Sequence, residues 1–144
     1  MMKKVAIVYW SGTGNTEAMA KAIECGVRKS GNAVNLFAVE QFGLADMKDF
    51  DGFIFGCPAM GDEVLEEGTF EPFFTEVEGH LSEVPVALFG SYGWGGGIWM
   101  KSWSERTRAA EARLFEDGLA VENGPGDEEL RACEQLGLSF AHSL

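Results

Sequence analysis

One short polar segment, residues 11–16, most constrains what this chain can fold into, because it separates an apolar run at 5–10 from an amphipathic segment that begins near Glu17. The segment contains two glycines, an amide and three hydroxyls, with neither lysine nor arginine: Ser11, Gly12, Thr13, Gly14, Asn15 and Thr16. Where a strand turns directly into a helix, the loop amides converge near the positive end of the helix dipole. Glycine allows the backbone to approach a ligand, and the polar side chains add donors. The pattern therefore predicts a strand, a turn and a helix that bind a phosphate without a cation.

Two common nucleotide-binding loops do not match this segment. A nucleoside-triphosphatase loop, G-x-x-x-x-G-K-S/T, needs a lysine for the outer phosphates, but no lysine follows Gly14 until Lys21. A dinucleotide fingerprint, G-x-G-x-x-G, that began at Gly12 would need a third glycine where the chain has Glu17. We therefore expect a single terminal phosphate monoester as the ligand. An ordinary solvated turn is the alternative, since the same residue types are common in turns.

Length and charge restrict the possible partners. The chain of 144 residues has the size of one domain, which we expect to span residues 1–144. Its net charge of −12 disfavours nucleic acids and anionic membranes, whose own charge would repel this surface. Partner proteins with basic docking surfaces would be attracted, although the same charge also serves solubility. We expect a monomer.

Neither the N-terminal segment nor the cysteines indicate export. The apolar run at 5–10 is too short for a signal sequence and lacks an A-x-A-like cleavage site, so we expect a cytoplasmic protein. No stretch approaches the roughly 20 apolar residues of a membrane span. The three cysteines include no C-x-x-C pair, and neither histidine stands at metal-ligand spacing from them. A disulfide framework, a zinc site and a Ser/His/Asp constellation are therefore not indicated.

Apolar runs and amphipathic segments alternate along the chain. The runs predict strands at 5–10, 34–39, 52–56, 84–89 and 113–121. Helical periodicity predicts helices at 16–29, 70–80 and 98–110, a short helix at 44–50 and a terminal helix with Asp127 as its N-cap. This alternation predicts a three-layer, doubly wound α/β fold with a five-stranded parallel sheet in the order 2-1-3-4-5. In such sheets, ligands bind beyond the carboxyl ends of the strands, where strands 1 and 3 diverge.

Three loops should meet at that edge of the sheet, because they follow strands 1, 3 and 4. They are residues 11–16, 57–67 and 91–97. The second loop has a polarizable thioether, Met60, followed by the flexible Gly61 and two carboxylates. The third places a tyrosine and a tryptophan among glycines, which leaves backbone amides open to a ligand. The sequence therefore predicts one binding site made from all three loops.

The three loops resemble those of the flavodoxins, small FMN-carrying electron shuttles, and specifically those of the short-chain group. The resemblance rests on YWSGTGNTE at 9–17, GCPAMGDE at 56–63 and LFGSYGWG at 88–95, and it continues through EPFF at 71–74. These motifs occur in the right order and at the right separations, so the resemblance covers nearly the whole chain. It implies a flavodoxin-like fold that binds FMN non-covalently.

The resemblance also implies a role for each loop. Residues 11–16 would bind the FMN phosphate, Trp94 would stack on one face of the isoalloxazine, and Met60 would cover the other. Glu63 would accept the hydrogen of the ring N3. The remaining contacts in the second and third loops would be Pro58, Ala59, Gly61, Asp62, Ser91, Tyr92, Gly93 and Gly95. Pro58 departs from those relatives that have a hydroxyl residue here, because proline cannot donate a hydrogen bond to the phosphate.

Several of these residues have a simpler alternative. Met60 could fill a gap in the core, and Trp94 and Tyr92 could be ordinary buried aromatic residues. We assign Trp10 mainly to core packing. Trp99 and Trp103, one helical turn apart, should anchor their helix onto the sheet.

The resemblance implies a low-potential one-electron carrier, not an enzyme, that cycles mainly between the semiquinone and hydroquinone of FMN and shuttles electrons between redox enzymes. Rotation of the peptide between Gly61 and Asp62 would stabilise the semiquinone, because glycine tolerates either sign of φ. Few cations and several carboxylates would oppose the last electron. The alternatives are an FMN-dependent reductase of the same fold, acting on quinones or similar acceptors, and an anion-binding module without flavin. Cover on both flavin faces argues against the reductase, because a nicotinamide could not lie flat on the ring.

Overall fold

The computed structural model describes residues 2–61 and 63–144. The strands are β1 (Lys4–Tyr9), β2 (Ala33–Ala38), β3 (Gly52–Gly56), β4 (Pro85–Tyr92), β5 (Arg113–Leu114) and β6 (Leu119–Glu122). The helices are α1 (Asn15–Lys29), α2 (Phe70–Glu78), α3 (Ile98–Ala109) and α4 (Asp127–His142), with short 3₁₀ helices at Val39–Gln41 and Leu44–Asp49. Among the described residues, no helix is long and apolar enough to cross a membrane.

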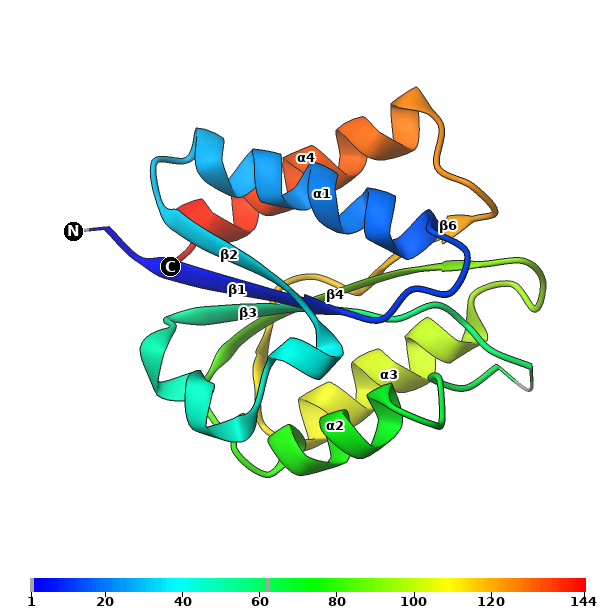
Figure 1. The fold of residues 1–144 in the computed structure, drawn as a ribbon, viewed down its shortest axis with the longest axis horizontal. Helices are drawn as coiled ribbons and strands as arrows, with labels where there is room; N and C mark the ends of the chain where they lie inside the picture. The colour runs from blue at the N-terminus through cyan, green and yellow to red at the C-terminus, as the bar shows by residue number, and fades with distance from the viewer. Residues whose placement is uncertain (1, 62) are drawn as a thin grey trace.

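The sheet has the predicted doubly wound topology. Its strands pair in parallel in the order β2-β1-β3-β4-β5, and β6 also pairs with β4. Helices α1 and α4 cover one face, and α2 and α3 cover the other (Figure 1). Both chain ends lie at one side of the molecule, and the loops after β1, β3 and β4 lie at the opposite side (Figure 1). The three-layer fold predicted from the alternating pattern is thereby confirmed.

The interior strand β1, between β2 and β3, is buried on both faces, which explains its continuous apolar sequence. Val5, Ala6, Ile7 and Val8 are completely buried. Because alternate residues of a strand point to opposite faces, Val5 and Ile7 pack with the α1 and α4 layer. Ala6 and Val8 pack with the helices of the other face. This buried strand fixes the position at which residues 11–16 begin.

The edge of the sheet differs from the prediction. The single strand predicted at 113–121 is two short strands, β5 and β6, which both pair with β4. Leu114 lies opposite Val86 of β4. Leu119 lies opposite Phe89 of β4. Between these two pairings the edge segment therefore has two more residues than β4. The extra residues loop out of the sheet, and the strand is interrupted there.

The start of α4 also differs by one residue from the prediction. Its N-cap is Gly126 rather than Asp127. The Gly126 N–H donates to Glu129 Oε1 over 2.8 Å, which closes the first turn around the glycine.

The second loop is tied to the start of α2 by Glu66. Its carboxylate accepts hydrogen bonds of 2.8 Å from the backbone N–H groups of Gly68, Thr69 and Phe70. Its own N–H donates to Cys57 Sγ over 3.3 Å. These contacts satisfy N–H groups at the helix start and connect the loop directly to the buried end of β3.

Candidate cofactor site

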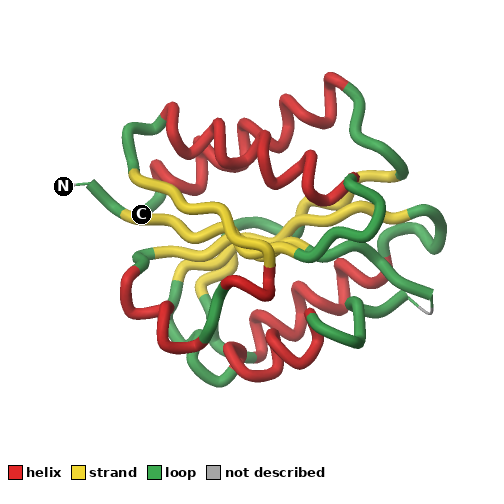
Figure 2. The backbone as a smooth tube through the Cα atoms, viewed as in Figure 1, coloured by secondary structure: helices red, strands yellow, loops and turns green. Residues whose placement is uncertain are grey.

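A cavity of about 280 Å³ is formed by the loops that follow β1, β3, β4 and β6. Its lining residues are Trp10, Gly12, Thr13, Asn15, Thr16, Pro58, Ala59, Met60, Ser91, Tyr92, Gly93 and Asn123. Figure 2 shows these loops gathered at one end of the sheet. In this strand order, the carboxyl ends of β1 and β3 form the switch point at which a doubly wound sheet binds its ligand. The structure therefore brings the three predicted loops to a single site.

The first loop supplies uncharged groups at the start of α1. Gly14 has a φ of 97°, a left-handed conformation that glycine adopts without strain, and α1 begins at the next residue. The N–H groups of Gly14 and Glu17 donate to Ser11 Oγ over 3.1 and 3.3 Å, so this hydroxyl shapes the loop. No lysine or arginine is among the described residues that line the cavity. Amides at a helix N-terminus form an anion site without a cation.

A buried hydroxyl pair joins the first loop to the third. Thr16 and Ser91 are 1% and 5% exposed, and their hydroxyl oxygens lie 3.2 Å apart. The N–H of Ala59 in the second loop donates to the Ser91 carbonyl over 2.9 Å. The three loops are therefore connected to one another by hydrogen bonds.

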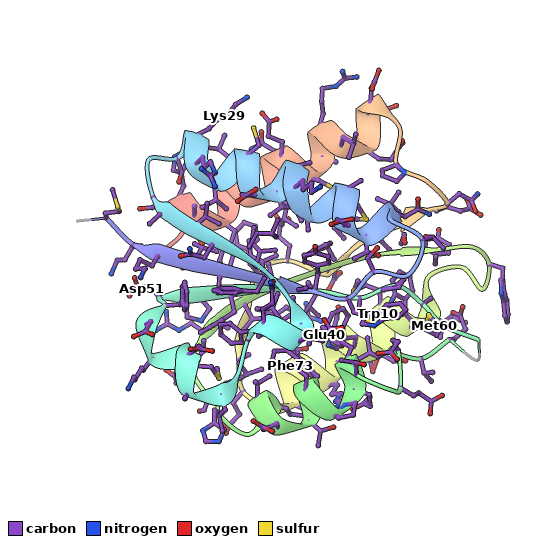
Figure 3. All side chains as sticks on the ribbon, viewed as in Figure 1. Trp10, Lys29, Glu40, Asp51, Met60 and Phe73 are labelled. Carbon is purple, nitrogen blue, oxygen red and sulfur yellow. The ribbon has the colours of Figure 1, made fainter. Side chains whose placement is uncertain are left out.

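The second loop is a tight turn that presents Met60 and Glu63. The Met60 N–H donates to the Val64 carbonyl over 2.9 Å, and the Glu63 N–H donates to the Met60 carbonyl over 2.8 Å. Met60 lines the cavity and is 37% exposed, which excludes the alternative that it only fills a core gap. Figure 3 shows Met60 at the same end of the molecule as Trp10.

Cys57 supports this turn from the core. Its side chain is completely buried, and its carbonyl accepts a 3.1 Å hydrogen bond from Trp99 Nε1. Burial raises the pKa of the Cys57 thiol to about 12. The thiol therefore stays protonated at neutral pH, as a buried packing residue does. Trp99, only 1% exposed, anchors α3 as predicted.

A contact between the second and third loops positions the Glu63 carboxylate. Gly95 has a φ of 90°, and a Cβ built on it would overlap Glu63 Oε1 and lie 2.6 Å from Oε2. A residue with a Cβ here would push the carboxylate aside, and the left-handed φ also favours glycine. Glu63 Oε2 is buried and has no hydrogen-bond partner among the described residues. Because Oε2 is enclosed by the protein, only Oε1 of this carboxylate could accept the N–H of a flavin ring, the contact that the resemblance implies.

Some of the predicted site residues line the cavity, and others lie in the same loops without lining it. Those that line it are Gly12, Thr13, Asn15, Thr16, Pro58, Ala59, Met60, Ser91, Tyr92 and Gly93. Those that belong to the same loops without lining it are Ser11, Gly14, Gly61, Glu63, Trp94 and Gly95. Asp62 lies outside the described residues. Trp94 is 66% exposed, so it is not the buried core residue of the simpler alternative.

Two lining residues were not predicted. Trp10, assigned to core packing, does pack against the core, but it also lines the cavity. A Cβ built at Gly12 would lie 3.0 Å from its Cη2 atom, so the glycine makes room for the indole. Asn123 follows β6, has a φ of 61°, and donates its N–H to the Tyr92 carbonyl over 2.7 Å. The Asn-Gly pair at 123–124 was the available signal, since it is typical of a turn.

Comparison with known proteins agrees with the geometry of the site. The family model described as Flavodoxin matches residues 7–137. The chain is 47% identical to the flavodoxin of Clostridium beijerinckii over 136 residues, which cover 94% of this chain and 98% of that protein. It is 46% identical to the flavodoxin of Megasphaera elsdenii over 137 residues, which cover 95% and 98% of the two proteins.

The structural comparison gives the same result. The solution structure of two-electron reduced Megasphaera elsdenii flavodoxin matches this fold with a TM-score of 0.87 and 45% identity, and the match covers 96% of this chain and 98% of that one. The fold, the uncharged loop at the switch point and the full-length similarity all lead to one assignment, and the reductase alternative is not favoured. The chain belongs to the flavodoxin family: it is an FMN-binding electron-transfer protein and not an enzyme.

Proposed function

We propose that this flavodoxin is a low-potential, one-electron carrier and that the cavity between its three loops is where FMN binds. Bound FMN supplies reversible one-electron chemistry, while the protein orients it, covers it and sets its potential. One observation carries the proposal: the cavity at the switch point of the sheet has a lining without lysine or arginine among the described residues.

Residues 11–16 hold the phosphate in this proposal. The backbone N–H groups that follow Gly14 belong to the first turn of α1 and are available to the phosphate. Thr13 and Asn15 add side-chain donors from the cavity lining. Ser11 Oγ already accepts two backbone N–H groups, so its hydroxyl hydrogen is what remains to donate. Pro58 lines the cavity but contributes no donor.

The second and third loops hold the ring. Met60 covers one face from the cavity lining. Trp94, whose indole is 66% exposed and therefore not committed to the core, covers the other. Glu63 accepts the N3 hydrogen from beside Gly95, and the backbone of Gly93 lines the same side. Both faces are then shielded from a second flat reactant.

Charge sets the low potential. A carboxylate about 10 Å away opposes an added negative charge by roughly 0.4 kcal/mol in water, before screening by salt. Several carboxylates together contribute about 1–2 kcal/mol, and roughly 1.4 kcal/mol corresponds to about 59 mV for one electron. The acidic chain, with its net charge of −12, therefore lowers the potential by tens of millivolts to about a hundred. We attribute the rest to apolar burial of the ring and to a lining that has no cation among the described residues.

The same charge selects the partners. A net charge of −12 favours redox proteins with basic docking surfaces. Trp94 and Ile98, 66% and 58% exposed, add apolar area beside the site for such a partner to cover. We propose that the protein is a cytoplasmic monomer. We also infer that residues 1–144 form one domain, because the described helices pack on the two faces of a single sheet.

A binding experiment tests the assignment of the phosphate loop. FMN and riboflavin, which differ only in the phosphate, are titrated into flavin-free protein and followed by flavin fluorescence. Thr13→Ala should weaken FMN roughly 10-fold, because it removes a hydrogen bond to a charged group, and leave riboflavin unchanged. Ser139→Ala, which removes a hydroxyl from α4 outside the cavity, is the control. Equal losses for both flavins, or no loss for either, would contradict the assignment.

A further inference from the structure

Helices α1 and α4 begin with the same pair of residue types, which the two helices use differently. Each has a glycine N-cap and a glutamate three residues later: Gly14 with Glu17, and Gly126 with Glu129. In α4, the Glu129 carboxylate turns back and accepts the Gly126 N–H over 2.8 Å. This arrangement is favourable because it pairs an open N–H group and places a negative charge at the positive end of the helix dipole. In α1, the Gly14 N–H donates to Ser11 Oγ instead, over 3.1 Å.

Tyr9 accounts for the different position of the Glu17 carboxylate. The Tyr9 hydroxyl donates to Glu17 Oε2 over 3.1 Å in a partly buried hydrogen bond. Tyr9 is the last residue of β1 and packs against the core layer of α1 and α4, so the sheet fixes the place of its hydroxyl. Burial and the hydrogen bond to Glu17 raise the pKa of Tyr9, so the hydroxyl keeps its proton and remains a donor at neutral pH. Lys21 Nζ also lies 3.9 Å from Glu17 Oε2, but such an exposed ion pair contributes little.

The Glu17 carboxylate would obstruct the proposed phosphate site if it turned back as Glu129 does. Glu17 lies in the first turn of α1, at the helix end where the phosphate is proposed to bind, but it does not line the cavity. An acidic residue at this position can reach the helix start. Asp46 does so in the 3₁₀ helix Leu44–Asp49, where its carboxylate accepts the Gly43 N–H over 2.9 Å. A carboxylate and a phosphate compete for the same N–H groups and repel each other. The direction of the Glu17 side chain therefore decides whether this end of α1 is open to an anion.

We propose that Tyr9 keeps the anion site at the start of α1 open by holding the Glu17 carboxylate away from it. Tyr9 is then a positioning residue for the FMN phosphate: it does not line the cavity, and it acts through Glu17. This inference rests on the proposed function of residues 11–16. Packing against the core needs only the aromatic ring, which phenylalanine also provides, so the hydroxyl has this separate use.

Titrations of flavin-free protein with FMN and with riboflavin test the role of Tyr9. Tyr9→Phe should weaken FMN roughly 5-fold, because the phosphate must then displace a helix cap of ordinary strength, and it should leave riboflavin unchanged. Adding Glu17→Ala should restore FMN affinity at least to that of the parent, because the competing carboxylate is gone. Adding Glu24→Ala instead removes a carboxylate about 10 Å further along α1 and should restore nothing.

The outcomes separate this proposal from the function on which it rests. An unchanged FMN affinity in Tyr9→Phe, equal losses for both flavins, or a double variant with Glu17→Ala that binds FMN no better than Tyr9→Phe would overturn the role of Tyr9. A parent protein that bound riboflavin as tightly as FMN would overturn the phosphate site itself. Urea midpoints of the flavin-free variants verify that each one folds.

A second variant tests the same idea with Tyr9 intact. Glu17→Asp keeps the negative charge but shortens the side chain by one methylene, so the hydrogen bond to the Tyr9 hydroxyl should be lost. Aspartate at this position still reaches a helix start, as Asp46 shows. Glu17→Asp should therefore weaken FMN as Tyr9→Phe does and leave riboflavin unchanged. An FMN affinity equal to that of the parent would overturn the proposal even if Tyr9→Phe did not fold.

Discussion

Comparing Gly95→Ala with Gly96→Ala should separate the effect of the third loop on stability from its effect on FMN binding. A Cβ at Gly95 would overlap Glu63 Oε1 and lie 2.6 Å from Oε2, so the carboxylate must move. The neighbouring Gly96 is a matched control: its φ is 70°, but a Cβ there meets no atom within 4 Å. Both variants therefore place alanine in a left-handed conformation, and only Gly95→Ala displaces Glu63.

The two effects have different magnitudes. An L-residue in the left-handed region costs roughly 1–2 kcal/mol, so both variants should lower the free energy of unfolding of the flavin-free protein by that amount. The overlap adds little to this, because the Glu63 carboxylate is the end of a flexible side chain. With FMN, Gly95→Ala also loses a hydrogen bond to a charged acceptor, which contributes about 1.5–3 kcal/mol. That loss corresponds to roughly 10- to 100-fold weaker binding than in Gly96→Ala.

Urea denaturation of the flavin-free variants measures the first quantity, and quenching of FMN fluorescence measures the second. The reasoning requires similar urea midpoints and clearly different dissociation constants. Equal FMN affinities for Gly95→Ala and Gly96→Ala would refute the role of Glu63 as an acceptor for the ring.

Three other predictions concern the potential and the acid stability. Gly61→Ala places its Cβ more than 4 Å from any other described atom outside its immediate neighbours, so the urea midpoint of the flavin-free protein should not change. If the peptide after it must rotate to stabilise the semiquinone, alanine disfavours the semiquinone by about 1 kcal/mol, and potentiometry should show the two one-electron potentials closer together. An unchanged separation would exclude the rotation. Raising the salt concentration should raise the more negative potential by tens of millivolts, because salt screens the carboxylates, and a flat response would count against them. The Arg106 hydrogen bond lowers the pKa of Glu71 from 4.5, so the stability from this pair is present above that pH and is lost as the pH falls through the lowered value. Arg106→Met should therefore have a urea midpoint that depends less on pH between about 5 and 3, and identical pH profiles would contradict this.

Local patterns were sufficient to predict the fold. The continuous apolar sequence of β1 and the polar segment at 11–16 indicated a buried strand, a turn and a helix without any long-range information. The alternation of strands and helices then left few sheet orders to consider. The interruption between β5 and β6 falls at Glu116-Asp117-Gly118, two acidic residues and a glycine, a local turn signal that the prediction of a single strand overlooked.

The parts of the site that sequence reasoning missed depend on contacts between distant segments. Asn123 reaches the cavity because β6 pairs beside β4, a pairing that the prediction of a single edge strand did not resolve. Trp10 serves both the core and the cavity, and a sequence pattern assigns it to only one of them. The contact of Glu63 with Gly95 requires the second and third loops to be placed side by side. Residue types alone therefore identified the loops but not how they fit together.

Stepwise reduction of the FMN-loaded protein, followed by absorption at controlled potential, tests most directly whether these loops form a one-electron carrier. The account predicts two resolved one-electron steps, with the second at the lower potential. A single two-electron step, or rapid oxidation of NADPH by the purified protein alone, would contradict it.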